Sequence, residues 1–282
     1  MVGIAAGRGR DRIAVEFDPL DGARITSLVA AGREWLAPSP PRDPEGGFTA
    51  SGTGGWDEVV PTVAACTMAD GTGLPDHGDA WRLEWSVVAS GPATSTAVVS
   101  LRSVPLQLSR TLTVEAGRLR ADYVATATGR AGVPLLWAAH PLFAAPPGTR
   151  IVTGAPEPRL VGEFPEAGSP MAWPGGATGR GGIDGVGGAL KAFTTGLDRA
   201  RIVHADGQGL TLRWDARTLP HLGLFWDAGV FADQPVVAIE PTTGCRDAAS
   251  AVEEELPVVS PGRPLRWWLE LSVDDADADD AD

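Results

Sequence analysis

Three short stretches of the sequence carry side chains that could exchange protons with a bound molecule. One of only four histidines, His77, lies in the turn-like stretch "LPDHGDAW" (74–81). A second, His140, lies in the apolar run "LLWAAHPLF", and Glu240 lies in the apolar run "VVAIEPTTG". Imidazoles and carboxylates can both be tuned to exchange protons near neutral pH. Their use therefore depends on whether the fold brings them together.

The elements that must position His140 and Glu240 are expected to be strands that end at a proline. Pro141 follows His140 directly, and Pro241 follows Glu240. Because proline cannot donate to a ladder, we expect each strand to end there with its polar side chain at the terminus. A carboxyl at the end of an apolar run is costly to bury unless it is paired or has a raised pKa. In the alternative, His140 is a hydrogen-bonded core histidine and Glu240 pairs with Arg246.

A further polar stretch, "GTGGWDEVVPTV", places Trp56, Asp57 and Glu58 behind a run of glycines. These acids could face a site, or they could be solvated turn residues. His204 and His221 have no comparable neighbours, and we interpret both as structural.

Apolar and polar residues alternate along most of the chain with a period of two, which is typical of half-buried strands. The clearest predicted strands lie at 13–17, 23–30, 81–87, 106–114, 119–123 and 265–273, and 201–214 is predicted to form two strands of a hairpin. We expect hairpins that turn at Ala116-Gly117 and at Asp206–Gly209. The prediction is an all-β fold of one domain over 1–273, a large antiparallel sandwich or barrel with few or no helices. The Gly-rich stretch 165–190 is expected to be a long surface loop.

The negative charge of the chain limits the kinds of molecule that it can bind. The formal net charge is −13, and six of the 36 acidic residues lie in the last nine residues, "DDADADDAD" (274–282). Without this stretch, 30 acids face 23 bases, and the balance is −7. We expect the acidic tail to be disordered, since it has no apolar surface to bury. Nucleic acid is an unsuitable partner, because phosphate binding needs a basic face.

The remaining composition predicts a protein of the cytoplasm. No apolar run is long enough to span a membrane, and no charged segment precedes an apolar one at the N-terminus. Cys66 and Cys245 are too few for a disulfide framework and lack the spacing of metal ligands. Lys191 is the only lysine among many arginines, which we interpret as genome composition. Most of the ten tryptophans are expected in the core, although the indole face also suits sugar stacking.

Four stretches together resemble the aldose 1-epimerases, the galactose mutarotase-like proteins. They are "GARITSLVAAGREWL", "DHGDAW", "WAAHPLF" and "GLFWDAG" with "VVAIEPTTG", in the family's order and rough spacing. The resemblance covers about residues 12–272, and "GGWDEVVPTV" is similar to one subgroup. It implies an antiparallel β-supersandwich, which agrees with the strand pattern.

The resemblance also implies roles. Glu240 corresponds to the catalytic base, His140 to the catalytic acid and His77 to the second active-site histidine. Six other residues are predicted to bind the substrate, as ring-stacking or wall residues, hydroxyl acceptors or the neighbour of His77: Trp56, Asp57, Glu58, Asp76, Trp81 and Trp226.

The implied reaction opens a cyclic aldose to its aldehyde and closes it on the other face. A base takes the C1 hydroxyl proton while an acid protonates the ring oxygen, and each transfer contributes about 10²–10⁴-fold. We expect partial burial to raise the pKa of Glu240, and a carboxylate neighbour to keep His140 charged. The partner is a small sugar, and no metal or organic cofactor is needed.

Two departures from the family pattern concern the substrate. The arginine that many members carry before the first histidine is replaced by the Trp-Asp-Glu stretch, and the asparagine before the second is Ala139. Three other functions stay open: a carbohydrate-binding or sensing protein on the same fold, a cupin-like metal enzyme, and a lyase or isomerase of acidic sugars. The cupin alternative lacks its His-x-His pair, and fold alone does not decide among the others.

Overall fold

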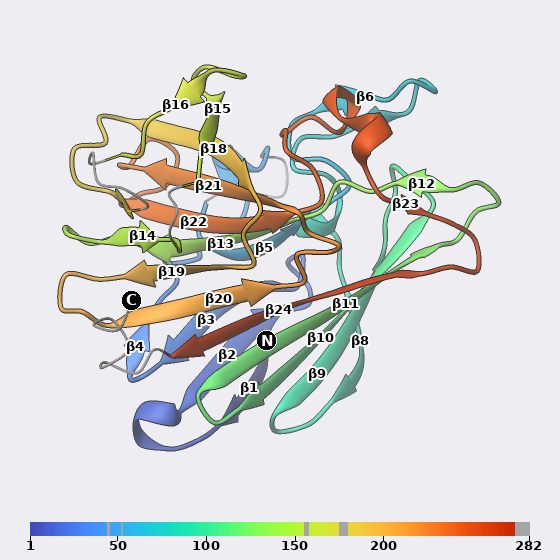
Figure 1. Ribbon diagram of the computed structural model, residues 1–282. Coiled ribbons are helices and arrows are strands. Elements are labelled where there is room, and N and C mark those ends of the chain that lie inside the picture. The colour runs from blue at the N-terminus through green and yellow to red at the C-terminus, as the bar shows by residue number, and fades with distance from the viewer. Residues whose placement is uncertain (44–45, 52, 155–157, 175–179, 274–282) are drawn as a thin grey trace.

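The computed structural model describes residues 1–43, 46–51, 53–154, 158–174 and 180–273, and these form an antiparallel β-structure (Figure 1). Two large sheets and two small ones account for the strands of the described chain. The helices there are short 3₁₀ turns: η1 (Gly9–Asp11), η2 (Thr49–Ser51), η3 (Ala80–Arg82), η4 (Ala249–Ala251) and η5 (Glu253–Glu255). The predicted all-β antiparallel class is confirmed.

The first large sheet contains the strands that carry the candidate chemistry. Its order is β1 (Val2–Ala6), β2 (Ile13–Asp18), β3 (Arg24–Ala30), β5 (Gly55–Val59), β13 (Ala138–Ala144), β22 (Val236–Thr242), β21 (His221–Asp227), β18 (Ala189–Thr195), β15 (Leu160–Phe164) and β16 (Pro170–Met171), with β4 (Arg33–Glu34) paired to β3. Strands from the two ends of the chain thus meet at its centre, where β13 lies between β5 and β22.

The second large sheet packs over the first through a shared core (Figure 1). Its order is β17 (Arg180–Gly182), β14 (Arg150–Val152), β19 (Arg199–Val203), β20 (Gly209–Trp214), β24 (Leu265–Val273), β11 (Arg118–Ala127), β10 (Leu106–Glu115), β9 (Thr94–Ser100) and β8 (Ser86–Ser90). The small sheets pair β6 (Cys66–Thr67) with β7 (Gly73–Leu74), and β12 (Val133–Pro134) with β23 (Val258–Val259).

The two predicted hairpins are confirmed. β10 and β11 pair from Leu106↔Ala127 to Glu115↔Arg118. Gly117, in the turn between them, has φ 72°, a conformation that glycine adopts without strain. β19 and β20 form the second hairpin. Apolar side chains alternate into the core on both strands of the first hairpin, and burial of this face holds its register.

A buried polar network joins the two sheets. Glu58 on β5 is fully buried and accepts hydrogen bonds from Arg110 at 3.0 Å, Tyr123 at 2.9 Å and Trp137 at 3.0 Å. Arg110 also donates to the carbonyl oxygen of Ala23 at 2.5 Å. Since an unpaired buried charge is costly, the network links the packing of β5 to that of β10 and β11.

The strand predicted over 81–87 was wrong in part. Trp81 lies in η3, and β8 begins only at Ser86. The backbone before β8 bonds to a loop instead of a neighbouring strand, since Trp85 N donates to the Pro19 carbonyl and the Leu83 carbonyl accepts from Gly22 N. The alternating burial of this segment therefore arises from irregular packing.

Two other predictions concern segments that the structure describes incompletely. The predicted surface loop at 165–190 is replaced in part by strands, namely β16, β17 and the start of β18. Residues 175–179 of this stretch lie outside the described residues. The acidic tail 274–282 also lies outside them, so the division into one domain and a tail stays a prediction. In the described part of the chain, every helix is too short or too polar to cross a membrane.

Candidate active site

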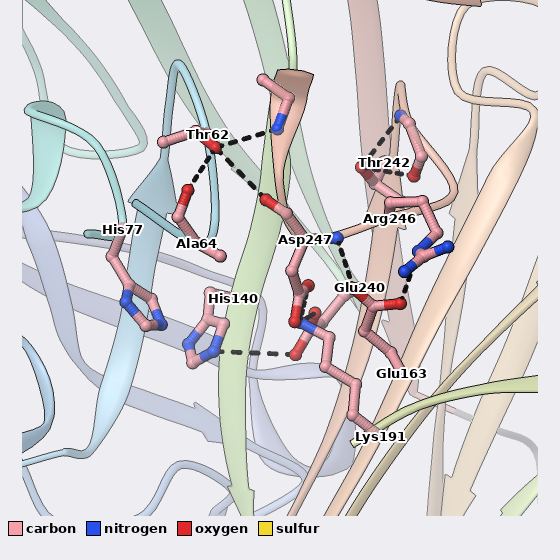
Figure 2. A network of polar contacts seen from close by, with 12 residues as sticks. Thr62, Ala64, His77, His140, Glu163, Lys191, Glu240, Thr242, Arg246 and Asp247 are labelled. Carbon is pink, nitrogen blue, oxygen red and sulfur yellow. Dashed lines mark hydrogen bonds and ion pairs between the residues drawn. The ribbon is translucent and has the colours of Figure 1, made fainter. Parts of the chain in front are cut away.

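A cavity of about 340 Å³ lies against the central strands of the first sheet. His140 on β13, Glu240 on β22 and His77 in the turn before η3 all line it. The residues predicted from three distant stretches therefore share one cavity. Figure 2 shows the two imidazoles side by side and the Glu240 carboxylate next to His140.

His140 and Glu240 face each other across two adjacent strands. The Nε2 atom of His140 lies 3.6 Å from Oε1 of Glu240, and the side chains are 8% and 2% exposed. In the described structure, Oε1 of Glu240 and Nδ1 of His140 have no hydrogen-bond partner. Buried polar atoms are normally satisfied, so these two are suited to bind a ligand.

The prediction that the strands end at the prolines was wrong. Pro141 pairs with Trp56 inside β13, and Pro241 pairs with Leu222 inside β22. Between these two strands, the register passes from Ala138↔Thr242 to Leu142↔Ala238 without an intervening pair among the described residues. The prolines lie in this gap, where the ladder needs no N–H donor.

Both predicted pKa directions were also wrong. Burial lowers the pKa of His140 to about 4, although the charge of Glu240 acts in the opposite direction. Burial alone would raise the pKa of Glu240, but the charge of Lys191, 2.9 Å from Oε2, is the largest opposing influence and the pKa lies below its ordinary value. At neutral pH the site holds an ionised glutamate beside a neutral imidazole.

Lys191 also belongs to the candidate site, although the sequence interpretation assigned it no role. Its ammonium group lies on β18, 2.9 Å from Oε2 of Glu240 and 2.8 Å from Oδ1 of Asp247, and its side chain is 7% exposed. Burial acts to lower the pKa of Lys191, but Asp247 and Glu240 together raise it well above the ordinary value. A signal was present in the sequence, because a single lysine between Leu190 and Ala192 predicts a buried cation that needs a carboxylate.

His77 is held in a strained turn. It has φ 54°, which is uncommon for a residue with a side chain. Its backbone N–H donates to Val63 at 2.6 Å, and its ring stacks on Phe48 with centroids 3.8 Å apart. Nδ1 lies 3.0 Å from the carboxylate of Asp76, which is half-exposed, and this contact lowers the pKa of Asp76. The ring centroid lies 5.8 Å from that of His140.

The aromatic part of the cavity wall consists of four phenylalanines that were not selected from the sequence: Phe48, Phe164, Phe225 and Phe231. Asp227 fixes the loop that carries Phe231, since its carboxylate accepts four backbone N–H bonds from residues 229–232. The position of Phe231 in the wall therefore depends on a buried acid that accepts four hydrogen bonds.

Most of the predicted substrate-binding residues lie outside the cavity lining. Trp56 and Trp226 are buried in the core between the sheets, and Glu58 belongs to the network with Arg110. Trp81 packs edge-on against Phe48, behind the wall. Of the six predicted residues, Asp76 alone is among the described residues that line the cavity.

Asp57, Arg246 and His204 have partners outside the cavity. Asp57 forms a two-pronged ion pair with Arg42 at 2.5 Å. The predicted alternative partner of Glu240, Arg246, instead pairs with Glu163 at 2.7 Å. His204 is buried beside Thr149. Within the described ranges, no three His, Cys, Asp or Glu side chains converge as metal ligands.

Comparison with solved structures shows the fold. Slr1438 from Synechocystis sp. PCC 6803 superposes with a TM-score of 0.75 at 19% identity, covering 93% of this chain and 91% of that protein. A candidate aldose 1-epimerase from Escherichia coli K12 gives 0.75 at 18%, covering 97% and 99%. A galactose mutarotase-like protein from Lactobacillus casei gives 0.72 at 16%, covering 96% and 100%. No family model and no curated protein matches the sequence. The chain has the fold of the aldose 1-epimerases and galactose mutarotase-like proteins.

Proposed function

We propose that this protein is an aldose 1-epimerase that interconverts the α and β anomers of a free aldose. The observation that supports this most is the carboxylate of Glu240 beside the imidazole of His140, 3.6 Å apart in the wall of a cavity. Ring opening needs one group to accept the C1 hydroxyl proton and one to protonate the ring oxygen, and both atoms are bonded to the same carbon. Two adjacent acid–base groups can serve both atoms at once.

The proposed reaction opens the sugar ring and closes it again. Glu240 takes the proton of the C1 hydroxyl, the bond between C1 and the ring oxygen breaks, and His140 gives a proton to that oxygen. The product is the open-chain aldehyde, with the former ring oxygen now a hydroxyl. Rotation about the C1–C2 bond exposes the other carbonyl face, and the same transfers in reverse close the ring as the other anomer.

The other lining residues bind the sugar in this proposal. His77 and Asp76 are placed to hydrogen-bond sugar hydroxyls, and Asp76 orients the imidazole at 3.0 Å. The phenylalanines offer flat apolar surfaces to the C–H faces of the ring. They take the role that the sequence analysis gave to Trp56 and Trp226, both of which are core residues.

The charge of the cavity supports a neutral sugar over an acidic one. Four carboxylates line it, at Asp76, Asp227, Glu240 and Asp247. Lys191 is the one lysine or arginine among its described lining residues, and it is already paired with two of those carboxylates. A uronate or sugar phosphate would meet net negative charge, which disfavours the acidic-sugar alternative.

One observation favours a second candidate, a carbohydrate-binding protein without catalysis. Because burial lowers the pKa of His140 to about 4, its neutral form predominates at neutral pH and serves a hydrogen-bonding role well. Under the epimerase proposal the protonated form is the minority reactive species. The cytoplasmic location expected from the sequence belongs to both candidates.

Exchange spectroscopy between the anomeric protons of several neutral aldoses separates the candidates. An epimerase accelerates α–β exchange in proportion to its concentration for at least one sugar. A binding protein perturbs or broadens the anomeric signals while exchange stays at the spontaneous rate. Spontaneous rates across the whole panel would overturn the proposed function.

A further inference from the structure

Lys191 holds one oxygen of Glu240 and leaves the other unpartnered. Its Nζ lies 2.9 Å from Oε2, whereas Oε1 is 3.6 Å from Nε2 of His140 and has no hydrogen-bond partner in the described structure. The two carboxylate oxygens thus have different surroundings. A carboxylate fixed in this way presents one defined oxygen to the cavity.

Residues on three neighbouring strands surround the Glu240 carboxylate. His140 faces it from β13 and Lys191 from β18, while Asp247, which follows β22, faces Lys191. On β21 the register partner is Gly223. A Cβ atom at Gly223 would lie 3.0 Å from Oε2, so the absence of a side chain there leaves room for the carboxylate.

Asp247 is itself anchored by its backbone. Its carbonyl oxygen accepts bonds from the N–H groups of Val63 at 2.9 Å and Ala64 at 2.8 Å, and its N–H donates to Glu163 at 3.1 Å. The Val63 carbonyl in turn accepts the N–H of His77 at 2.6 Å. Figure 2 shows Asp247 between the Thr62–Ala64 segment and the Lys191 side chain. The loop that carries His77 and the acid that holds Lys191 therefore form one connected support.

We propose that Lys191, braced by Asp247, is a positioning residue for Glu240 that keeps Oε2 occupied and directs Oε1 toward the cavity and His140. This inference rests on the proposed function for the role of Glu240 as base, but the contact itself can be tested without turnover. Loss of the ammonium would leave two carboxylates, Glu240 and Asp247, without their common cation. Burial would then raise the pKa of Glu240, and a larger part of the protein would carry a protonated, inactive base.

The chain offers a direct test because it contains a single lysine. Protein prepared with ¹³C,¹⁵N-lysine gives one set of lysine side-chain signals, which needs no assignment. In the wild type, we expect the ammonium to lose its proton only above the ordinary lysine pKa, and its signals to shift as Glu240 titrates in acid. In Glu240→Gln, the part of the acid shift due to Glu240 should vanish. Identical lysine titrations in the two proteins, or an ordinary lysine pKa in the wild type, would overturn the contact.

Kinetics then test the positioning role. In Lys191→Met, we expect the acid limb of kcat/KM to move up by about one pH unit or more, a tenfold loss below the limb, with kcat affected more than KM. Lys191→Arg should restore the limb, because it keeps the cation. Arg33→Met, which removes a cation paired with Asp206 outside the cavity, is the matched control and should leave the profile unchanged.

The two readouts separate the two ideas. Wild-type protein that accelerates no aldose exchange, yet shows the Glu240-dependent lysine shift, would reject the proposed function and keep the contact. An unchanged acid limb in a folded Lys191→Met would reject the positioning role. If Lys191→Met fails to fold, the pH profile of Lys191→Arg decides. An acid limb at the wild-type pH supports the positioning role. An acid limb shifted up by about one pH unit despite the retained cation contradicts it.

Discussion

Replacing Arg110 by methionine should destabilise the protein strongly through Glu58. The variant removes the ion pair to Glu58 at 3.0 Å and leaves the Ala23 carbonyl without its donor at 2.5 Å. The guanidinium also lies 5.4 Å above the ring of Trp85, a contact that methionine only partly replaces. Removing one partner of a buried pair costs about 3–5 kcal/mol, a large share of the roughly 5–15 kcal/mol typical of a folded protein.

The loss of stability in Arg110→Met should depend on pH in one direction. Burial raises the pKa of Glu58 above its ordinary value, and Arg110 opposes that rise. A carboxyl whose pKa is raised in the folded state contributes most stability below its unfolded pKa and loses that contribution as pH rises through the folded pKa. Without Arg110 the folded pKa rises further. The loss should therefore be greatest at neutral pH and smaller near about pH 5, where Glu58 can take up a proton.

Urea unfolding of the wild type, Arg110→Met, Glu58→Gln and the double variant at both pH values provides the assay. The double variant should recover part of the loss, because it buries no unpaired charge. A loss below about 1 kcal/mol at neutral pH would refute the reasoning. A double variant as unstable as the sum of the two single variants would do the same, since it would show that the two side chains are not coupled.

Three further predictions concern the cavity. Because the pKa of His140 is lowered to about 4, its protonated form declines with rising pH, so kcat/KM should increase as the pH is lowered from about 8 to about 5; a flat rate profile would show that the proton comes from another group. Gly223→Ala should reduce kcat/KM by about tenfold or more, since the new Cβ would press on Oε2 of Glu240 at 3.0 Å. Circular dichroism checks that the variant keeps its fold. Full activity would mean that the position of the carboxylate is not critical. Turnover should survive extensive chelation, because the proposed proton transfers use side chains alone; loss of activity that added zinc or manganese restores would contradict this.

The sequence predicted those parts of the fold in which alternating apolar residues lie on strands that pair with each other. The hairpin of β10 and β11 follows from alternating apolar residues around Ala116-Gly117, and the structure pairs it throughout. The same alternation at Trp81 and Leu83 does not form a strand. There, the backbone bonds to Pro19 and Gly22, partners about sixty residues away that no local pattern identifies.

The candidate site was also predicted only in part. His77, His140 and Glu240 were selected by type and motif, and they share one cavity. The signs of their pKa shifts could not be obtained in the same way, because they depend on spatial neighbours. Lys191 is 49 residues from Glu240 in the chain, and its contact reverses the expected rise in the pKa of the glutamate. Glu58, predicted to bind the substrate, lies outside the cavity lining for the same reason, since Arg110 and Tyr123 approach it from the opposite sheet.

The central claim is that Glu240 and His140 act together as base and acid on one sugar. Anomer exchange by NMR in Glu240→Gln, His140→Gln and the double variant, with sugar affinity measured on the same samples, tests it most directly. Each single variant should lose at least about 10²-fold in exchange rate with little change in affinity. The double variant should be little slower than either single one, because the two groups act as a unit. Exchange that persists in both single variants, or affinity that falls in step with the rate, would contradict the account.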